Sequence, residues 1–455
     1  MDLFSALQTS VSGLQAQSYA ISNISGNIAN SQTTGFRRVD TSFVDLMNES
    51  VPKRETSGSV IAQSQLTNTL AGNIVSTNVA TNMAISGQGF FTVVQKTGDA
   101  NGAAVVGGAT MYTRRGDFSE DKDGYLVNGA GGYLTGTNLD ASTGQVTNTG
   151  PVKISNVSLP AQPTTTISYA ANLPATPITT DSPITGKDIY TAGPVVTSGT
   201  ATSAPVASTD TTTFIDNSIA GPSITTYTAT GAPVTLNTRW AKVQDADTNG
   251  NQAVWNLYYS STPSASATAS TWNNVGTAFA FDTTGKMTDP STGSVTLDGA
   301  KVGDYTFDKL SLNIGTSGLT QYADTSGAVT TNTLTQNGYT AGTLTSVAVG
   351  SDGKINGTFS NGTVAPIATV GIAQFANPDG LRGDTSGNYL QTVDSGPPLS
   401  GLNGSTLSGA SVEQSNTDIA TEFSKMIVTQ QAYSANTRVM STAQTMMSDL
   451  LNVIR

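Results

Sequence analysis

The sequence predicts a mainly β protein with long terminal α-helices, in which two or more β domains are nested between coiled-coil-forming N- and C-terminal helices. Apolar residues recur at alternating three- and four-residue steps at both ends of the chain, and this 3.5-residue repeat is typical of paired helices. Short alternating apolar segments separated by turn residues fill the interior, as β-hairpins require. Charged residues form only 11% of the 455 residues, and glycine numbers 47. Both values favour antiparallel strands over helices or disorder.

The two terminal helices are expected within residues 1–30 and 411–455, which together would form a terminal helical coiled-coil domain. The last helix is expected to begin at Ser415, because Asp418 follows three residues later with capping-box spacing. We predict that the apolar ladders on the two helices form a polymerisation stripe. Its members are Phe4, Leu7, Val11, Leu14, Ile21, Ile28, Ile419, Phe423, Met426, Tyr433, Met440, Met447, Leu451 and Ile454.

Two arrangements could bury this stripe. The helices of one chain could pair antiparallel and close an ordinary globular core, or other copies of the chain could complete the two ladders. We favour the second arrangement, because both ends carry the same repeat. It leads us to expect largely disordered ends in a single copy, which would fold on assembly.

Composition excludes several classes of function. The net charge of −11 and the lack of a sustained basic run argue against nucleic-acid binding. Without Cys or His, the chain has neither thiolate or imidazole zinc ligands nor the partners of a Ser-His-Asp triad. No carboxylate stands in a catalytic motif, so we expect a protein that is not an enzyme, without cofactor, metal or catalytic residues.

One segment, Asp245–Gly250, has the spacing of the first half of a calcium-binding loop. Asn256 stands where the bidentate Glu should be, and a strand-like pattern follows, so we predict a hairpin turn and leave ion binding open. The flanking strands would carry two alternating series: Val234, Leu236, Thr238 and Trp240, then Ala253, Trp255, Leu257 and Tyr259.

The amino terminus does not have the pattern of a cleaved secretory signal. Only Asp2 is charged before Arg37, and the apolar residues are spaced rather than continuous. No apolar run approaches the length of a membrane span. If the protein leaves the cell, we expect an export route without a cleaved peptide.

The segment after the first helix resembles the amino-terminal motif of the bacterial flagellar rod and hook family of axial proteins. That motif is an Asn-Ile-Ala-Asn core followed by Thr-x-Gly-Phe and a basic residue. The matching positions are Asn27, Ile28, Ala29, Asn30, Thr34, Gly35 and Phe36, followed by Arg37. The same residues are also compatible with a helix that ends near Asn30 and a turn at Gly35.

Further stretches extend the resemblance toward both flanks of the interior. Residues 89–91, 113–118 and 124–127 are similar to the first strands of the family's inner β domain, and residues 370–377 to its returning strands. The expected order is an extended connector over 31–82, a discontinuous inner β domain over 83–160 and 335–410, and an outer β domain over 161–334. The outer domain would carry a Thr/Ser/Pro-rich insertion.

The resemblance implies a structural subunit that polymerises with itself into a curved, flexible tube. It also implies a universal joint that passes torque from rod to filament and a central export channel. The implied partners are the distal rod protein, the cap, the junction protein at the filament and the flagellar export apparatus, and the implied location is the extracellular flagellum. Alternatives are the distal rod protein of the same family or an exported β-rich adhesin or carbohydrate-binding protein. Arg37, Arg38, Arg114 and Arg115 would contact acidic surfaces of neighbouring subunits or lie in solvent.

Overall fold

The computed structural model describes residues 3–46, 59–100, 103–154, 157–181, 189–190, 211–246, 252–262 and 271–453. The chain divides into two compact units. Unit 1 comprises Met1–Val157 and Leu344–Arg455, and unit 2 is the intervening segment Ser158–Thr343. The predicted fold class is confirmed, because a long helix at each end encloses β structure and the two helices pack together.

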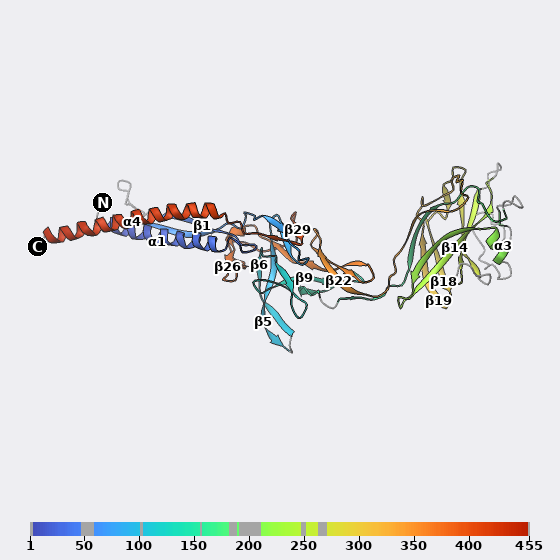
Figure 1. Cartoon of the computed structure of the whole chain (residues 1–455), viewed down its shortest axis with the longest axis horizontal. Helices are drawn as coiled ribbons and strands as arrows, with labels where there is room; N and C mark the ends of the chain where they lie inside the picture. Colours follow the sequence, from blue (N-terminus) through green and yellow to red (C-terminus); the bar gives the residue numbers. More distant parts are fainter. Residues whose placement is uncertain are drawn as a thin grey trace. The chain divides into compact units, whose positions relative to one another are not determined.

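The terminal helices are α1 (Leu3–Ala29) and α4 (Ile419–Val453), which run side by side in unit 1 (Figure 1). They are antiparallel, since Gly13 lies near Asn436 and Asn27 near Glu422. The start of α4 differs from the expected capping box. Asp418 is the capping residue, and its Oδ1 accepts a hydrogen bond from Thr421 N at 2.9 Å. Ser415 lies outside the helix.

Part of the expected connector is a β-hairpin. Strands β1 (Val39–Leu46) and β2 (Ser59–Leu66) pair antiparallel. The hairpin lies along α1, where Tyr19 and Ser64 share a 2.6 Å hydrogen bond between hydroxyls and Asn23 Nδ2 donates to Thr41 Oγ1 at 2.9 Å. These polar contacts join the hairpin to the helix, and the sequence of the hairpin lacks the strict apolar alternation of a buried strand.

The β structure of unit 1 is built from both flanks of unit 2. Thr369 in β24 pairs with Thr137 in β9, and Ile372 in β25 pairs with Phe91 in β5. The main sheet runs β22-β23-β24-β9-β5-β6-β27-β26. The first flank supplies β3 (Ile74–Ser76), β4 (Met83–Ser86), β5 (Phe90–Ala100), β6 (Ala103–Thr113), β7 (Phe118–Glu120), β8 (Leu126–Asn128), β9 (Gly132–Leu139) and β10 (Val146–Pro151). The second supplies β22 (Gly342–Val349), β23 (Lys354–Phe359), β24 (Val364–Val370), β25 (Ile372–Gln374), β26 (Arg382–Gly383), β27 (Tyr389–Leu390), β28 (Leu399–Ser400), β29 (Thr406–Gly409) and β30 (Ser411–Glu413), with a short 3-10 helix at Pro378–Gly380.

Unit 2 contains two five-stranded sheets that share one apolar core. One sheet is β13-β14-β15-β16-β17, and the other is β18-β19-β12-β20 with β21 paired to β12. The bounds are β11 (Ser158–Leu159), β12 (Thr166–Asn172), α3 (Thr211–Asp216), β13 (Ile219–Tyr227), β14 (Pro233–Gln244), β15 (Ala253–Ser260), β16 (Trp272–Phe281), β17 (Met287–Asp289), β18 (Ser294–Val302), β19 (Tyr305–Asn313), β20 (Leu319–Thr320) and β21 (Thr330–Gln336).

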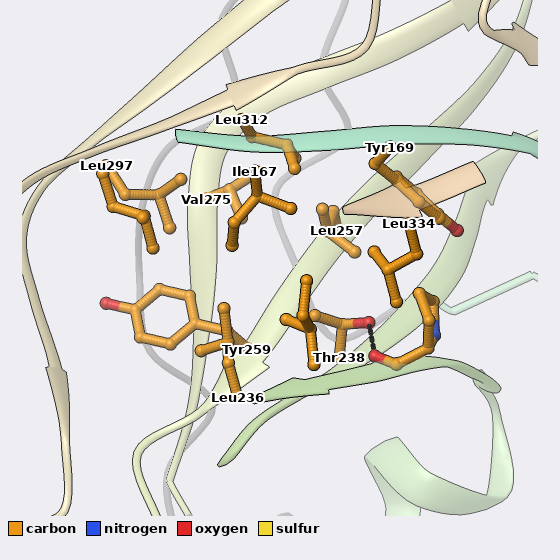
Figure 2. A pocket seen from close by; sticks show the side chains of 13 residues that line it. Ile167, Tyr169, Leu236, Thr238, Leu257, Tyr259, Val275, Leu297, Leu312 and Leu334 are labelled. Carbon is orange, nitrogen blue, oxygen red and sulfur yellow. Dashed lines mark hydrogen bonds between the residues drawn. The ribbon is translucent and has the colours of Figure 1, made fainter. Parts of the chain in front are cut away.

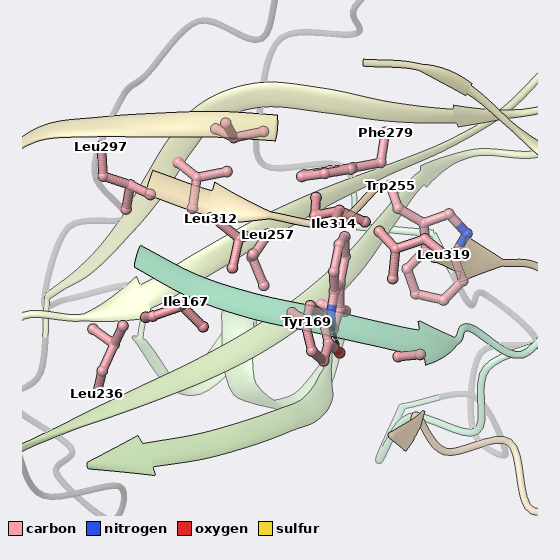
Figure 3. Close-up of a cluster of buried hydrophobic side chains, with 14 of the residues drawn as sticks. Ile167, Tyr169, Leu236, Trp255, Leu257, Phe279, Leu297, Leu312, Ile314 and Leu319 are labelled. Carbon is pink, nitrogen blue, oxygen red and sulfur yellow. Dashed lines mark hydrogen bonds between the residues drawn. The ribbon is translucent and has the colours of Figure 1, made fainter. Parts of the chain in front are cut away.

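The predicted hairpin of unit 2 is confirmed. Strands β14 and β15 pair antiparallel with Trp240 opposite Leu257. The core between the sheets holds Trp255 and Phe279 (Figure 3), and Trp240 Nε1 donates to Tyr169 Oη at 3.1 Å. Burial raises the pKa of Tyr169 to about 12. A cavity of about 30 Å³ lies beside Tyr169, where Ile167, Leu236 and Leu257 help to line it (Figure 2). It is a small apolar packing gap.

Substitution of Trp240 by Ala should destabilise unit 2 strongly. The side chain is fully buried, so its removal leaves a cavity and takes one of two hydrogen-bond partners from the Tyr169 hydroxyl. We expect a loss of about 3–5 kcal/mol of unfolding free energy, measured by denaturant titration followed by circular dichroism. Tyr322→Ala is the control, because Tyr322 is 54% exposed. Equal small losses in both variants would contradict this assignment of the core.

Candidate polymerisation site at the terminal helices

Helices α1 and α4 meet through small side chains. The residues of α1 that are buried follow a three- and four-residue spacing, and most of them are small: Ser10, Gly13, Ala16, Ala20, Ile24 and Asn27. A Cβ atom placed on Gly13 would lie 3.0 Å from Nδ2 of Asn436. Among the α4 side chains that the structure describes, only Glu422 and Ala443 are buried. The seam within one chain is therefore built from small and polar residues.

The predicted stripe lies beside this seam and not in it. Four of its members remain exposed: Val11 at 43%, Ile419 at 41%, Phe423 at 50% and Tyr433 at 39%. Leu7, Leu14, Ile21, Ile28, Met426, Met440 and Met447 are half-buried. The side chains of Phe4, Leu451 and Ile454 lie outside the described part of the chain.

The expectation of disordered ends in a single copy differs from the structure, in which one chain already pairs its two helices. The two helices of one chain do pair antiparallel, as the first of the two arrangements supposed. This pairing does not bury the predicted stripe, because large apolar side chains of α4 stay in solvent. Sequence analysis also missed Ile427, Val428, Val439 and Met446, which are exposed by 49–65%. The sequence pattern that could have identified them is the distribution of apolar residues around more than one face of α4.

A polar network fixes the end of the helix pair nearest the β structure. The buried amide of Asn27 donates from Nδ2 to Glu422 Oε2 and to Val39 O, at 2.9 Å each, and its Oδ1 accepts from Val39 N at 2.9 Å. Lys425 Nζ contacts Asp40 Oδ1 at 2.7 Å and Glu422 Oε1 at 3.2 Å. Burial acts to lower the pKa of Lys425, but its hydrogen bonds to Asp40 and Glu422 outweigh it, and the pKa is raised. The ammonium therefore stays charged and neutralises the buried carboxylate of Glu422.

The Thr34-Gly35-Phe36 part of the motif forms the turn that leads from α1 into the β structure. Asn30 Nδ2 donates to Gly26 O at 2.9 Å, and the same carbonyl accepts Asn30 N at 3.1 Å near the end of the helix. Gly35 has a φ of +67°, and a Cβ there would lie 2.6 Å from the backbone of Arg114. Only glycine fits this position. Its N–H donates to Glu413 O at 2.7 Å.

Two arginines that sequence analysis assigned to neighbouring subunits or to solvent are buried in their own chain. Arg37 Nη2 lies 2.7 Å from Glu413 Oε1, and Arg114 Nη1 lies 3.3 Å from Glu413 Oε2. We call these three residues the ion triad. Burial lowers the pKa of Arg114 to about 10, and the attraction of Glu413 opposes this. Arg38 and Arg115 are only half-buried and pair with Asp40 and Asp117.

Most of the candidate calcium loop is not described by the structure. Residues 247–251 lie outside the described part of the chain, and Asn256 is a buried residue of β15. Within the described ranges, no group of three or more Asp and Glu side chains could hold a metal ion. None of the helices that the structure describes is long and apolar enough to cross a membrane.

Comparison with known proteins covers both the helices and the inner sheet. Residues 7–37 match the flagella basal body rod protein family, and residues 84–172 match the D1 domain of the flagellar hook protein FlgE/F/G family. Residues 408–453 match the C-terminal family of the flagellar basal body rod FlgEFG protein. The FlgE flagellar hook protein of Brucella abortus is 30% identical over 470 residues, and the match covers 100% of both chains. This chain belongs to the flagellar hook protein family.

The FlgE hook protein of Salmonella typhimurium is 29% identical, and the alignment covers 97% of this chain and 98% of that protein. A crystal structure of the Helicobacter pylori flagellar hook protein FlgE2 aligns with a TM-score of 0.49 at 15% identity, over 71% of this chain and 96% of that one. As a hook family member, the chain is a structural, non-enzymatic subunit of the flagellar hook. Membership implies that it polymerises with itself in the flagellum.

Removal of the charge of Glu413 should destabilise unit 1. Glu413→Gln leaves two buried guanidinium groups without a counter-charge, and breaking a buried pair in this way costs about 3–5 kcal/mol. Denaturant unfolding of the variant measures the loss. Glu120→Gln serves as the control, since Glu120 is exposed at the end of β7. A loss no larger than that of the control would show that the ion triad contributes little.

Proposed function

We propose that copies of this hook protein assemble through the polymerisation stripe into a curved, flexible tube with a central export channel. The tube acts as a universal joint that passes torque from the rod to the filament. The observation that carries the proposal is the exposure of Ile419, Phe423 and Tyr433 by 39–50% although α4 is already paired with α1. Contiguous exposed apolar side chains are typical of an interaction surface.

The pair of α1 and α4 has two kinds of surface. Small residues form the contact between the two helices of one chain, so the exposed apolar residues of α4 remain available to contact other copies. Contacts between unlike surfaces of identical subunits generate open helical arrays when the rotation from copy to copy does not close a ring. Burial of apolar area at about 25 cal/mol per Å² would then drive assembly.

The surface of unit 2 supports contacts that exchange as a tube bends. The three tryptophans of the sequence are all buried in this unit. Among its described residues, the only large apolar side chains that are exposed are Ile178 and Tyr322. Interfaces without buried aromatic anchors are weak. We infer that unit 2 corresponds to the outer domain expected at 161–334 and forms such contacts, while unit 1 holds the tube together.

Further partners belong to this proposal. They are the distal rod protein, the hook cap, the hook–filament junction protein and the flagellar export apparatus. The location is outside the cell, after export without a cleaved signal peptide. The alignment with hook proteins runs the full length, inserted unit included, which favours this function over that of a distal rod protein or an adhesin.

Substitution of Phe423 by Ser should reduce polymerisation without unfolding the subunit. The side chain is half exposed, so the fold loses little when it is shortened, whereas a copy that packs on it loses an anchor. We expect the concentration needed for polymers to rise at least tenfold, measured by sedimentation and electron microscopy. Val393→Ser is the matched control, because Val393 is 97% exposed in a turn of unit 1. Unchanged assembly of the Phe423 variant would count against the stripe.

Removal of the inserted unit tests the division of labour. Ser158 pairs with Thr343 and Leu159 with Gly342, so an Asn-Gly turn can join Leu159 directly to Gly342. The shortened chain should still form tubes, and their curvature and bending stiffness should differ from those of the intact protein in electron micrographs. A soluble shortened chain that forms no polymers would contradict the proposal.

A further inference from the structure

A short strand before the inner sheet has one unpaired edge. Strand β3 pairs with β30 through Ile74 opposite Glu413 and Ser76 opposite Ser411. Gln414 N donates to Asn73 O at 2.8 Å and Thr77 N to Ala410 O at 2.7 Å. Because peptide groups alternate in direction along an antiparallel strand, those of Ile74 and Ser76 point away from β30. Among the described strands, none pairs with this edge.

The same segment exposes apolar side chains. Leu70, Ile74, Val75 and Val79, which we call the edge patch, are exposed by 48%, 40%, 42% and 48%. Natural proteins protect free strand edges with charged residues, proline or a covering element, or keep the edge strand very short, as β3 is with three residues. The segment 70–79 contains no charged residue and no proline. Its chemistry is that of a strand that receives a partner.

The edge patch is held firmly by the ion triad and its surroundings. Gly72 N donates to Glu413 Oε1 at 2.8 Å, and Asn416 Nδ2 donates to Leu70 O at 3.1 Å. A Cβ on Gly72 would lie 1.9 Å from Gln414 O, so this close approach requires glycine. A surface fixed in this way loses little conformational entropy when a partner binds.

The patch continues toward the polymerisation stripe. Segment 70–76 is hydrogen-bonded to residues 411–416, and α4 begins at Ile419 only three residues later. Ile419 and Phe423 are exposed at that end of α4. A partner that packs on the first turns of α4 therefore comes within reach of the free edge of β3.

We propose that the edge patch is a second contact of the polymer and receives a second copy of this chain, which packs on Val75 and bonds to the free edge of β3. The inference rests on the proposed function and names a surface outside the helices that takes part in it. An open polymer requires heterologous contacts, so the edge would meet a different part of the neighbouring copy. It joins the β structure of one copy to the next, so the helices are not the only link along the polymer.

The lack of cysteine in the sequence makes a thiol-protection experiment possible. In full-length Val75→Cys and Val393→Cys proteins, the introduced cysteine is the only thiol. Each variant is mixed with an excess of unmodified chain, and reaction with a maleimide is timed before and after polymerisation. We expect the rate at position 75 to fall at least tenfold in polymers, and the rate at position 393 to change less than twofold.

Each outcome decides the inference separately from the proposed function. Equal labelling rates at position 75 in monomer and polymer would overturn the edge contact, while loss of assembly in Phe423→Ser would still support the stripe. Exclusion of the Val75→Cys chain from polymers that accept Val393→Cys would support the contact. Protection of both positions alike would indicate a general screening of thiols in the polymer and would also overturn the assignment to the edge patch.

Discussion

The rest of unit 1 depends on one buried carboxylate. Glu413 pairs with Arg37 from the turn after α1 and with Arg114 from the end of β6, and it accepts the N–H of Gly72. Arg114 also donates to the carbonyls of Ile85 and Gly87. Removing one member of a buried ion pair leaves a charge without compensation, which is costly. The ion triad therefore specifies one arrangement of segments that lie hundreds of positions apart in the sequence.

The ion triad lies where both terminal helices join the β structure of unit 1. Glu413 lies six residues before the start of α4, and Arg37 lies eight residues after the end of α1. Both helices thus enter the β structure beside the same charge cluster. Within the helix pair itself, Asn27 of α1 bonds to Glu422 of α4, which also contacts Lys425. The direction of the helix pair relative to the inner sheet is set by buried polar contacts, which tolerate little displacement.

The sequence predicted the strands well and the helix contacts only in part. Alternation at Trp240 and Leu257 identified a hairpin because these side chains face one core. On α4, the spacing of apolar residues identified an apolar ladder, but this spacing did not show which face of the helix α1 would cover. A seam of Gly13, Ala16 and Ala20 has no strong apolar signal, since close backbone approach and not side-chain size makes the contact.

The ion triad lay beyond any local pattern. Arg114 and Glu413 are 299 positions apart, and an isolated arginine pair in a sequence is most often solvated surface. The β1–β2 hairpin escaped detection for a related reason, because Asn23 and Tyr19 hold it through hydroxyl and amide groups. Polar contacts of this kind depend on exact distances, which only the folded chain defines.

The bending tube proposed above requires some contacts that stay fixed and others that slide, and the two units of this chain differ in chemistry in a way that fits this requirement. The elements around Glu413 are joined by buried charges and by glycines that admit no side chain, such as Gly35 and Gly72. Unit 2 keeps its tryptophans inside, and its described residues present few large apolar groups at the surface. In the proposed polymer, the apolar residues that the helix pair leaves exposed and the edge patch of β3 would supply the strength between copies. Because the seam of the pair uses small residues, it frees the large ones on α4 for other copies.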